Sequence, residues 1–306
     1  MDMVGAVVVL FWVRGGFGWC GGSDRTGLPL PENPRTIIII LLRELHEPLA
    51  RYFRCMILVV ALIGMQVMSR AQTTHGVSKQ EVSSVVPFVG CKSDGQVGPL
   101  KAPSGKGKVV QTDTEKAQRL AYYKAEQGVG VLAPRGWFCF GTYGSNASNL
   151  YVSPQPMDAK TLFPTSGKGF TGPVVQMSVE YGGTSGRFDV AQIIARVFPA
   201  HRAFVHRVIA EGIEPASDFP FGPYPNDRLT YKNKETVEYE TPAHADGLGT
   251  QSLLQKNDDP IRGVAILIGP DTDLLFLSVR VPHEMDDLIP TVIRQVEREA
   301  AVAVRP

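Results

Sequence analysis

Residues 264–281 read VAILIGPDTDLLFLSVRV, and this stretch decides the fold class. Two apolar runs, 264–268 and 274–281, flank the sequence GPDTD at 269–273. Glycine, proline and aspartate favour tight turns, and the flanking runs are rich in residues that favour strands. The stretch therefore predicts a β-hairpin.

A second hairpin and a helix are predicted on either side of the first. Residues 229–231 and 236–239 flank the turn KNK at 232–234. Residues 283–300 have the spacing of an amphipathic helix, with a kink expected at Pro290. The residues expected to face inward are Leu288, Ile289, Val292, Ile293 and Val296.

Two further helices are predicted upstream. One begins at the capping-box sequence TDTE (112–115) and ends at Gly128, because glycine commonly terminates a helix. The other spans 189–210 and is broken near Pro199, because proline removes a backbone hydrogen bond.

The remaining segments predict short strands and loops. Strands are expected at 129–132, 137–142, 150–153 and 174–181, and the last alternates apolar and polar residues as a half-buried strand does. The Gly/Pro-rich segments 86–108 and 154–173 are expected to be loops, and 72–86 a mobile tail. Because strands arrive as hairpins with helices between or after them, we expect an α+β fold: an antiparallel sheet built from hairpins with three main helices packed on it.

An export signal is predicted away from the N-terminus. Residues 56–68 read MILVVALIGMQVM, with arginines before this apolar run and Ser69-Arg70-Ala71 after it. A basic start, a short apolar core and small residues before a cut are typical of a secretory signal peptide. We expect a signal peptide at 56–71, cleaved between Ala71 and Gln72, and a periplasmic or secreted mature chain of residues 72–306.

The 55 residues before this signal differ in composition from the rest. Residues 1–71 contain seven arginines and no lysine, whereas residues 72–306 contain twelve of each. We interpret 1–55 as an extension that is either disordered or the product of an incorrectly assigned translation start. The alternative is a genuine N-terminal membrane anchor.

The composition of residues 72–306 argues against two classes of partner. With 25 acidic and 24 basic residues the net charge is about −1, and no basic run is present to neutralise the phosphates of a nucleic acid. No apolar run after residue 71 is long enough to span a bilayer, which takes about 20 residues. We expect an envelope or extracellular partner of unknown identity.

Two cysteines, Cys91 and Cys139, remain after the predicted cleavage. An even number in an oxidising compartment favours a disulfide between them. Two buried free thiols are the alternative; neither cysteine has the CxxC partner or nearby histidine of a metal site.

Sequence motifs give weak support for catalysis. The sequence GKGFTG at 167–172 matches G-x-G-x-x-G but precedes a strand instead of a helix, so we expect no dinucleotide and no other cofactor. The GKGK sequence after Ser104 is only superficially like a phosphate-binding loop. Ser145 and Ser185 lie in Gly-rich turns without a G-x-S-x-G motif, and we interpret them as turn residues.

Histidines and acidic residues form two candidate metal clusters. One joins Glu240, His244 and Asp246, and the other lies at 283–287 (HEMDD). Acidic residues are common at a helix start and in solvated loops, so each cluster also has a structural interpretation.

We expect a non-catalytic cell-envelope or extracellular binding protein. The alternative is an exported hydrolase with a dispersed Ser/His/Asp-type or metal site. A deep cleft that combines His201, His206 or His244 with Ser, Asp or Glu would favour the hydrolase. A shallow surface lined by Trp137, Tyr143 or Phe221 would favour binding.

Overall fold

The computed structural model describes residues 82–162 and 169–303. By its contacts the chain divides into two units, Met1–Gly76 and Val77–Pro306. All the described elements belong to the second unit.

The predicted leader lies outside the described residues. This applies to the extension 1–55, the signal segment 56–71 and the cut between Ala71 and Gln72, which therefore stay predictions. In the part of the chain that the structure describes, no helix is long and apolar enough to cross a membrane.

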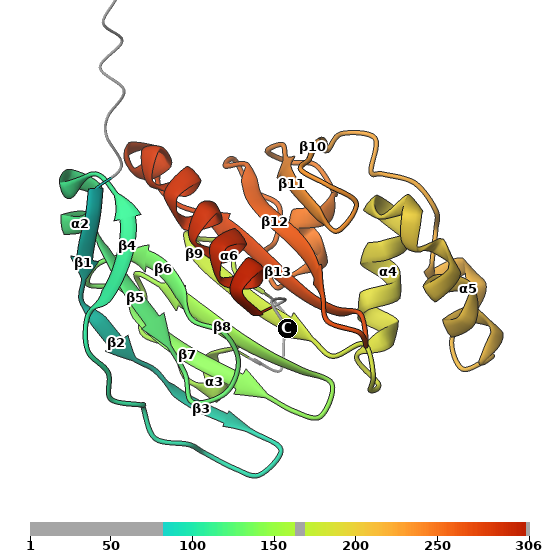
Figure 1. Cartoon of the computed structure of the whole chain (residues 1–306), viewed down its shortest axis with the longest axis horizontal. Coiled ribbons are helices and arrows are strands. Elements are labelled where there is room, and N and C mark those ends of the chain that lie inside the picture. The colour runs from blue at the N-terminus through green and yellow to red at the C-terminus, as the bar shows by residue number, and fades with distance from the viewer. Residues whose placement is uncertain (1–81, 163–168, 304–306) are drawn as a thin grey trace, which may run out of the picture. The chain divides into compact units, whose positions relative to one another are not determined.

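The fold is built around an eight-stranded sheet in the order β10-β11-β12-β13-β9-β8-β7-β3 (Figure 1). Neighbouring strands are antiparallel except β3 and β7, which are parallel. The strands are β3 (Lys92–Gly95), β7 (Phe138–Tyr143), β8 (Ala147–Ser153), β9 (Val174–Glu180), β10 (Arg228–Tyr231), β11 (Thr236–Thr241), β12 (Ile261–Ile268) and β13 (Asp273–Arg280).

Both predicted hairpins are present in this sheet. In β12–β13, Ile268 pairs with Asp273, and Gly269 and Thr272 in the turn have positive φ angles of 68° and 61°. In β10–β11, Tyr231 pairs with Val237. The turn chemistry therefore located both hairpins correctly.

Two smaller sheets complete the β-structure. One has the order β2-β5-β6, with β2 (Phe88–Gly90), β5 (Leu120–Lys124) and β6 (Val131–Pro134). The other pairs β1 (Val82–Val86) with β4 (Lys108–Thr112). The mixture of strands and helices confirms the α+β class. The expectation of a purely antiparallel sheet is wrong, because β2 pairs with β5, and β3 with β7, in parallel.

The described residues contain five α-helices, so the expectation of three main helices is also wrong as stated. The helices are α2 (Thr114–Arg119), α3 (Ala159–Leu162), α4 (Arg187–Val197), α5 (Arg202–Ala210) and α6 (Ile289–Ala303). The described residues also contain four short 3₁₀ turns: η1 (Pro199–His201), η2 (Ala216–Asp218), η3 (Leu248–Gln251) and η4 (His283–Leu288).

The predicted break near Pro199 and the C-terminal helix are present. α4 ends at Val197, η1 begins at Pro199, and α5 follows directly. The C-terminal segment begins as η4 and becomes α-helical at Ile289, so Pro290 lies in the first turn of α6, where proline is tolerated.

The predicted helix from Thr112 to Gly128 is wrong beyond its first turn and a half. Asp113, not Thr112, caps α2 by accepting a hydrogen bond from the Lys116 amide at 2.8 Å. From Leu120 the chain becomes strand β5, paired with β2 on one side and β6 on the other. Pairing on both sides supplies the backbone bonds that a helix would have provided, and outweighs helix propensity.

Helices cover both faces of the main sheet. α6 packs against β12, where Val264, Leu277 and Val292 belong to one apolar core. α4 and α5 cover the opposite face, where Ile194 and Phe276 belong to a second core. Figure 1 shows α6 running diagonally across the sheet, with α4 and α5 to its right. β9 and β13 are consequently buried on both faces, so the expectation of a half-buried strand at 174–181 is wrong.

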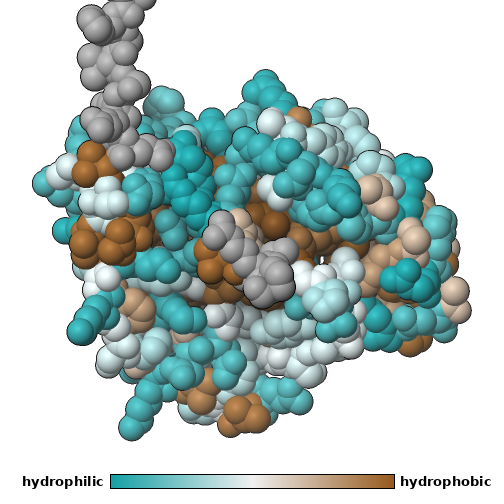
Figure 2. Space-filling view, viewed as in Figure 1, coloured by the Kyte–Doolittle hydropathy of each residue, from teal (hydrophilic) through white to brown (hydrophobic). Residues whose placement is uncertain are grey.

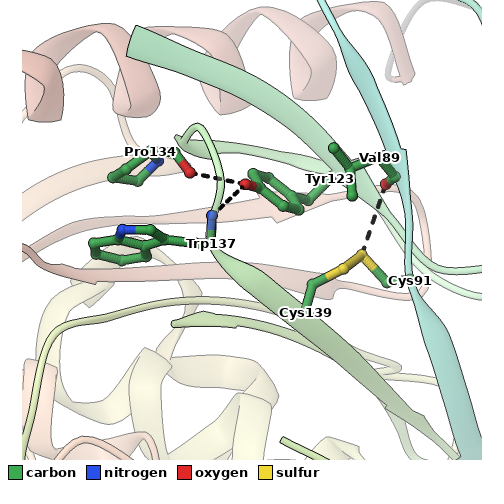
Figure 3. Close-up of a disulfide and its surroundings, with 6 residues drawn as sticks. All are labelled: Val89, Cys91, Tyr123, Pro134, Trp137 and Cys139. Atoms are coloured by element: carbon green, nitrogen blue, oxygen red, sulfur yellow. Dashed lines mark hydrogen bonds between the residues drawn. A yellow bond between two sulfur atoms is a disulfide. The ribbon is translucent and has the colours of Figure 1, made fainter. Parts of the chain in front are cut away.

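A disulfide joins Cys91 to Cys139, in agreement with the predicted pairing (Figure 3). Their Cα atoms are 5.4 Å apart, within the usual range for disulfides. Cys91 directly follows β2 and Cys139 lies in β7, so the bond ties the three-stranded sheet to the eight-stranded one. Beside it, the Tyr123 hydroxyl donates to the Pro134 carbonyl at 2.8 Å and accepts from the Trp137 amide at 3.1 Å.

The segment 86–108, expected to be a loop, contains β2 and β3. β2 pairs in parallel with β5, and β3 pairs in parallel with β7. Their three and four residues are too short for the apolar alternation by which a strand is recognised in sequence. These strands form because they pair with β5 and β7, which lie far away in the sequence, and because the disulfide links Cys91 to Cys139 of β7.

Candidate functional site

The best candidate site is a cavity of about 230 Å³ between the main sheet and α4, here named the α4 cavity. Its apolar wall is formed by Ile193 of α4 with Leu274 and Phe276 of β13. Its polar side chains come from the turn before β8 and from β8, β9, α4 and η3. They are Asn146, Asn149, Glu180, Asp189, Gln192 and Gln251.

Strand β9 gives the cavity its polar floor. Successive side chains of a strand point to opposite faces, so Gln176, Ser178 and Glu180 share the face toward α4. Met177 and Val179 face α6 and join its apolar core. The strand therefore presents its polar residues on one side only.

The polar side chains under the cavity form a connected network. Gln176 accepts the Leu253 amide at 3.0 Å and donates to the Ser178 hydroxyl at 3.1 Å. Ser178 in turn donates to the Oδ1 of Asn149. Buried polar groups that are bonded in this way hold one orientation, so the Asn149 amide is fixed at the cavity wall.

The start of α4 places two more cavity residues. Asp189 lies in its first turn, and Gln192 and Ile193 follow three and four positions later, on the same helix face. The turn before the helix needs glycine at position 186, because a Cβ there would collide with the Asn146 carbonyl oxygen. Asn146 and α4 are thus held close together.

A fully buried arginine holds the loop on the other side of the cavity. Arg280, 1% exposed, donates to the carbonyls of Phe170, Gly172 and Gln255 at distances of 2.5–3.0 Å. These bonds fix the segment that follows η3. At the start of η3, the Asp227 carboxylate accepts the Leu248 amide at 2.8 Å.

The two carboxyl groups of the cavity are electrostatically unusual. Burial raises the pKa of Glu180 to about 8, and the nearby Asp189 charge adds to the shift. Burial also raises the pKa of Asp189. At neutral pH Glu180 is therefore mainly a protonated acid, whose hydroxyl is able to donate a hydrogen bond to a ligand. Within the described residues, no lysine, arginine or histidine lines the cavity.

The histidines considered in the sequence do not meet in a cleft. His201 lies 3.9 Å from Glu235, and His206 packs its ring on Phe221 with centroids 5.3 Å apart. His244 is largely exposed and lies 3.2 Å from Asp258. Among the described residues, none of these histidines forms a hydrogen bond with a serine, and they do not assemble a Ser/His/Asp-type site.

Neither candidate metal cluster is assembled. Glu240 pairs instead with Arg228 and Arg262, at 2.8 and 2.7 Å. Asp246 pairs with Lys256 at 2.8 Å. In residues 82–162 and 169–303, no three His, Cys, Asp or Glu side chains come together in the manner of a metal site.

The second cluster belongs to the start of the C-terminal helical segment. His283 lies 3.2 Å from Asp286, and Arg262 lies 3.3 Å from the same carboxylate. Asp287 pairs with Arg119 at 3.0 Å. These contacts fasten η4 to the sheet and to α2.

The serines and aromatics named as candidates lie apart from one another. Ser145 is exposed in the turn between β7 and β8, and Ser185 lies in the turn before α4. Trp137 packs near the disulfide, and the Tyr143 hydroxyl bonds the Gly98 carbonyl at 2.6 Å. Phe221 lies against His206 on α5, so these aromatics do not form one recognition surface.

In the part of the chain that the structure describes, neither glycine-rich motif leads into a helix. Residues 167 and 168 of the GKGFTG motif are outside the described residues, and the rest leads into β9, not into a helix. The segment after Ser104 leads into β4.

A larger groove of about 680 Å³ runs between α6 and the β10–β11 hairpin. Its charges are largely paired with each other: Lys232 with Glu238 at 2.9 Å, and Glu240 with two arginines. The face that carries α6 is mainly hydrophilic, with apolar patches at its left margin and in a hollow near its centre (Figure 2). The patch at the margin overlies β1 and β4, where Val82, Val85 and Val109 are exposed.

The sequence analysis missed Glu180, Asp189, Gln192 and Gln251. The available signal was the polar alternation of Gln176, Ser178 and Glu180 inside a run that ends at a Gly-rich turn. Once the strand is known to be central in the sheet, polar residues at these positions predict a polar site beneath a helix.

No family model, no curated protein and no solved structure matches this chain.

Proposed function

We propose that this chain is an exported, non-catalytic binding protein and that the α4 cavity is its binding site for a small polar ligand. The observation that carries the proposal is the convergence of two carboxyl and four amide side chains around one cavity of about 230 Å³. Concave sites with a few convergent polar groups on an apolar wall are typical of small-molecule binding.

The cavity sets limits on its ligand. The volume equals that of about eight water molecules at about 30 Å³ each. A ligand of roughly eight non-hydrogen atoms would fill it, with its carbon skeleton against Leu274 and Phe276. The amides of Asn149 and Gln192 supply both donors and acceptors.

Export is supported by two features that agree with each other. The sequence of residues 56–71 has the order of a signal peptide. The Cys91–Cys139 disulfide suits a periplasmic or extracellular compartment, where disulfides persist. The proposal therefore places the binding site in the cell envelope or outside the cell.

A hydrolase remains the second candidate, on one specific observation. Glu180, mainly protonated at neutral pH, and Asp189 lie in the same cavity, and the charge of Asp189 adds to the raised pKa of Glu180. Two carboxyl groups whose environments separate their protonation states are the arrangement of a general acid and base. This candidate predicts turnover of a ligand that the binding proposal expects to be released unchanged.

The binding proposal is tested with a set of polyols, amides, amines and carboxylates of up to about ten non-hydrogen atoms. Binding is measured by ligand-observed NMR on residues 72–306. We expect binders whose signal is lost in Gln192→Leu, which removes a cavity amide, and kept in Gln127→Leu, which alters an exposed turn. Binding that is equal in both variants, or no binder in a folded protein, would contradict the proposal. A chemical change in a bound compound would favour the hydrolase.

A further inference from the structure

We propose that the ligand of the α4 cavity is a small organic amine, held as its ammonium ion between Glu180 and Asp189, and that its binding releases the proton of Glu180. This inference rests on the proposed function, because it requires the cavity to be a binding site. It adds the chemical class of the ligand and a proton that leaves when the ligand enters.

In the part of the chain that the structure describes, the cavity lining supplies no counter-charge for these carboxyl groups. Among the described residues that line the cavity, none is cationic. The nearest arginine in sequence, Arg187, is bound elsewhere: it donates to both carboxylate oxygens of Glu211 at 2.9 Å and to the Thr184 carbonyl at 2.7 Å. A cation that enters the cavity therefore meets two carboxyl groups without competition from a side chain.

The cavity suits an organic cation better than a bare metal ion. Its volume of about 230 Å³ leaves room for a carbon skeleton, and Ile193, Leu274 and Phe276 give that skeleton an apolar wall. An ammonium group has three N–H donors, which the two carboxylates and an amide oxygen of Asn149 or Gln192 can accept. In the described part of the chain, three metal-ligating side chains do not gather anywhere.

The carboxyl group of Glu180 carries the proton that the ligand would displace. Glu180 faces Asp189 from α4 and Tyr151 from β8, and burial raises the pKa of the Tyr151 hydroxyl so that it stays neutral. β13 contributes Leu274 and Phe276, and η3 contributes the uncharged Gln251. Because the pKa of Glu180 is about 8, this carboxyl group is mainly protonated in the free site at pH 7, and the negative charge that acts on it is that of Asp189.

Binding of the ammonium ion changes this balance. Its positive charge favours the ionised form of Glu180, so the carboxylic acid gives its proton to the solvent and becomes a carboxylate. The bound amine keeps its own proton. The net reaction takes up one ammonium ion and releases one proton, and the affinity for the amine should therefore rise with pH up to about 8.

The experiment compares three compounds of matched shape: butylamine, 1-butanol and butyrate. Isothermal titration calorimetry at pH 7 in phosphate and in MOPS, whose ionisation enthalpies differ, counts the protons released. We expect butylamine to bind most tightly, with release of about 0.9 proton, and its affinity to rise about tenfold per pH unit from 6 to 7.5.

Two variants and a control complete the test. Glu180→Gln resembles the protonated acid, so butylamine should bind about ten- to hundredfold more weakly, with no proton release and no dependence on pH. Asp189→Asn should weaken binding similarly but keep the pH dependence. Glu126→Gln, at an exposed turn, should behave as the parent protein. Circular dichroism verifies that each variant is folded.

Four results would overturn the inference. Tighter binding of 1-butanol, or amine binding without proton release, would show that the cavity prefers another class of ligand while the proposed function survives. Calcium ions that release the same proton more effectively would identify a metal ion as the ligand. If none of the three compounds, and no member of the wider set, binds a folded protein, the proposed function fails as well.

Discussion

Replacing Glu180 by glutamine should make the protein more stable at alkaline pH. The pKa of this carboxyl group is raised from its ordinary value of 4.5 to about 8, first by burial and then by Asp189. Between these two values the folded protein binds a proton that the unfolded chain does not. The stability that this proton contributes is complete below pH 4.5 and is lost as the pH rises through 8.

The magnitude follows from the size of the shift. A difference of about 3.5 pKa units, at 1.36 kcal/mol each, corresponds to about 5 kcal/mol of unfolding free energy. Because Glu180 is partly exposed, solvent screening reduces the expected effect to about 3–5 kcal/mol. Glu180→Gln removes this dependence, because glutamine does not titrate.

Urea unfolding at pH 5 and pH 8.5 measures the effect. We expect the stability of Glu180→Gln relative to the parent to increase by about 2–4 kcal/mol between these two pH values, because part of the total change lies outside this interval. Glu126→Gln, which changes an exposed glutamate, should follow the parent at both. Parallel pH profiles for Glu180→Gln and the parent would refute the reasoning, because Glu180 would then titrate alike in the folded and unfolded states.

Three further predictions concern stability. Arg280→Met leaves several buried carbonyls without donors and should lower the unfolding free energy by about 3–5 kcal/mol in urea titrations. The control Arg228→Met, at a side chain that is 79% exposed, should change the unfolding free energy by less than about 1 kcal/mol. Similar losses in the two variants would show that the Arg280 bonds are unimportant. The Cys91–Cys139 disulfide closes a loop with a sequence separation of 48, so its reduction should lower the unfolding free energy by about 4 kcal/mol. Urea titrations with and without reductant measure this difference, and equal midpoints would contradict the linkage. Tyr239→Phe removes a buried hydroxyl that donates to the Leu277 carbonyl at 2.9 Å, so it should cost about 1–2 kcal/mol, and a neutral effect would mean that the bond adds nothing.

Sequence reasoning succeeded where local chemistry decides the structure. The turn at 269–273 and the turn at 232–234 each fix a hairpin, and both hairpins are present. The break at Pro199 is also local, because proline cannot continue the hydrogen-bond ladder of α4.

Sequence reasoning failed where distant strands decide the structure. Residues 120–124 have the composition of a helix end, but β2 and β6 pair with them on both sides. The parallel partners of β2 and β3 lie more than 30 residues away in the sequence, and nothing in a Gly/Pro-rich segment indicates such pairing.

The candidate site was missed for the same reason. Glu180 and Asp189 look ordinary in sequence, as the end of a strand and the first turn of a helix. They become a site only because α4 folds back over β9 and because Arg280 and Asp227 hold the η3 region in place. The disulfide could be predicted, since only two of the four cysteines lie after the predicted cleavage site and they allow a single pairing.

The most direct test of the account is the titration of the Glu180 side-chain carbonyl carbon by NMR, with and without saturating butylamine. We expect an apparent pKa of about 8 in the free protein and a decrease of at least one unit when the amine is bound. A pKa near 4.5 in the free protein, or a value that butylamine leaves unchanged, would contradict the claim that Glu180 is a protonated acid at a cation-binding site.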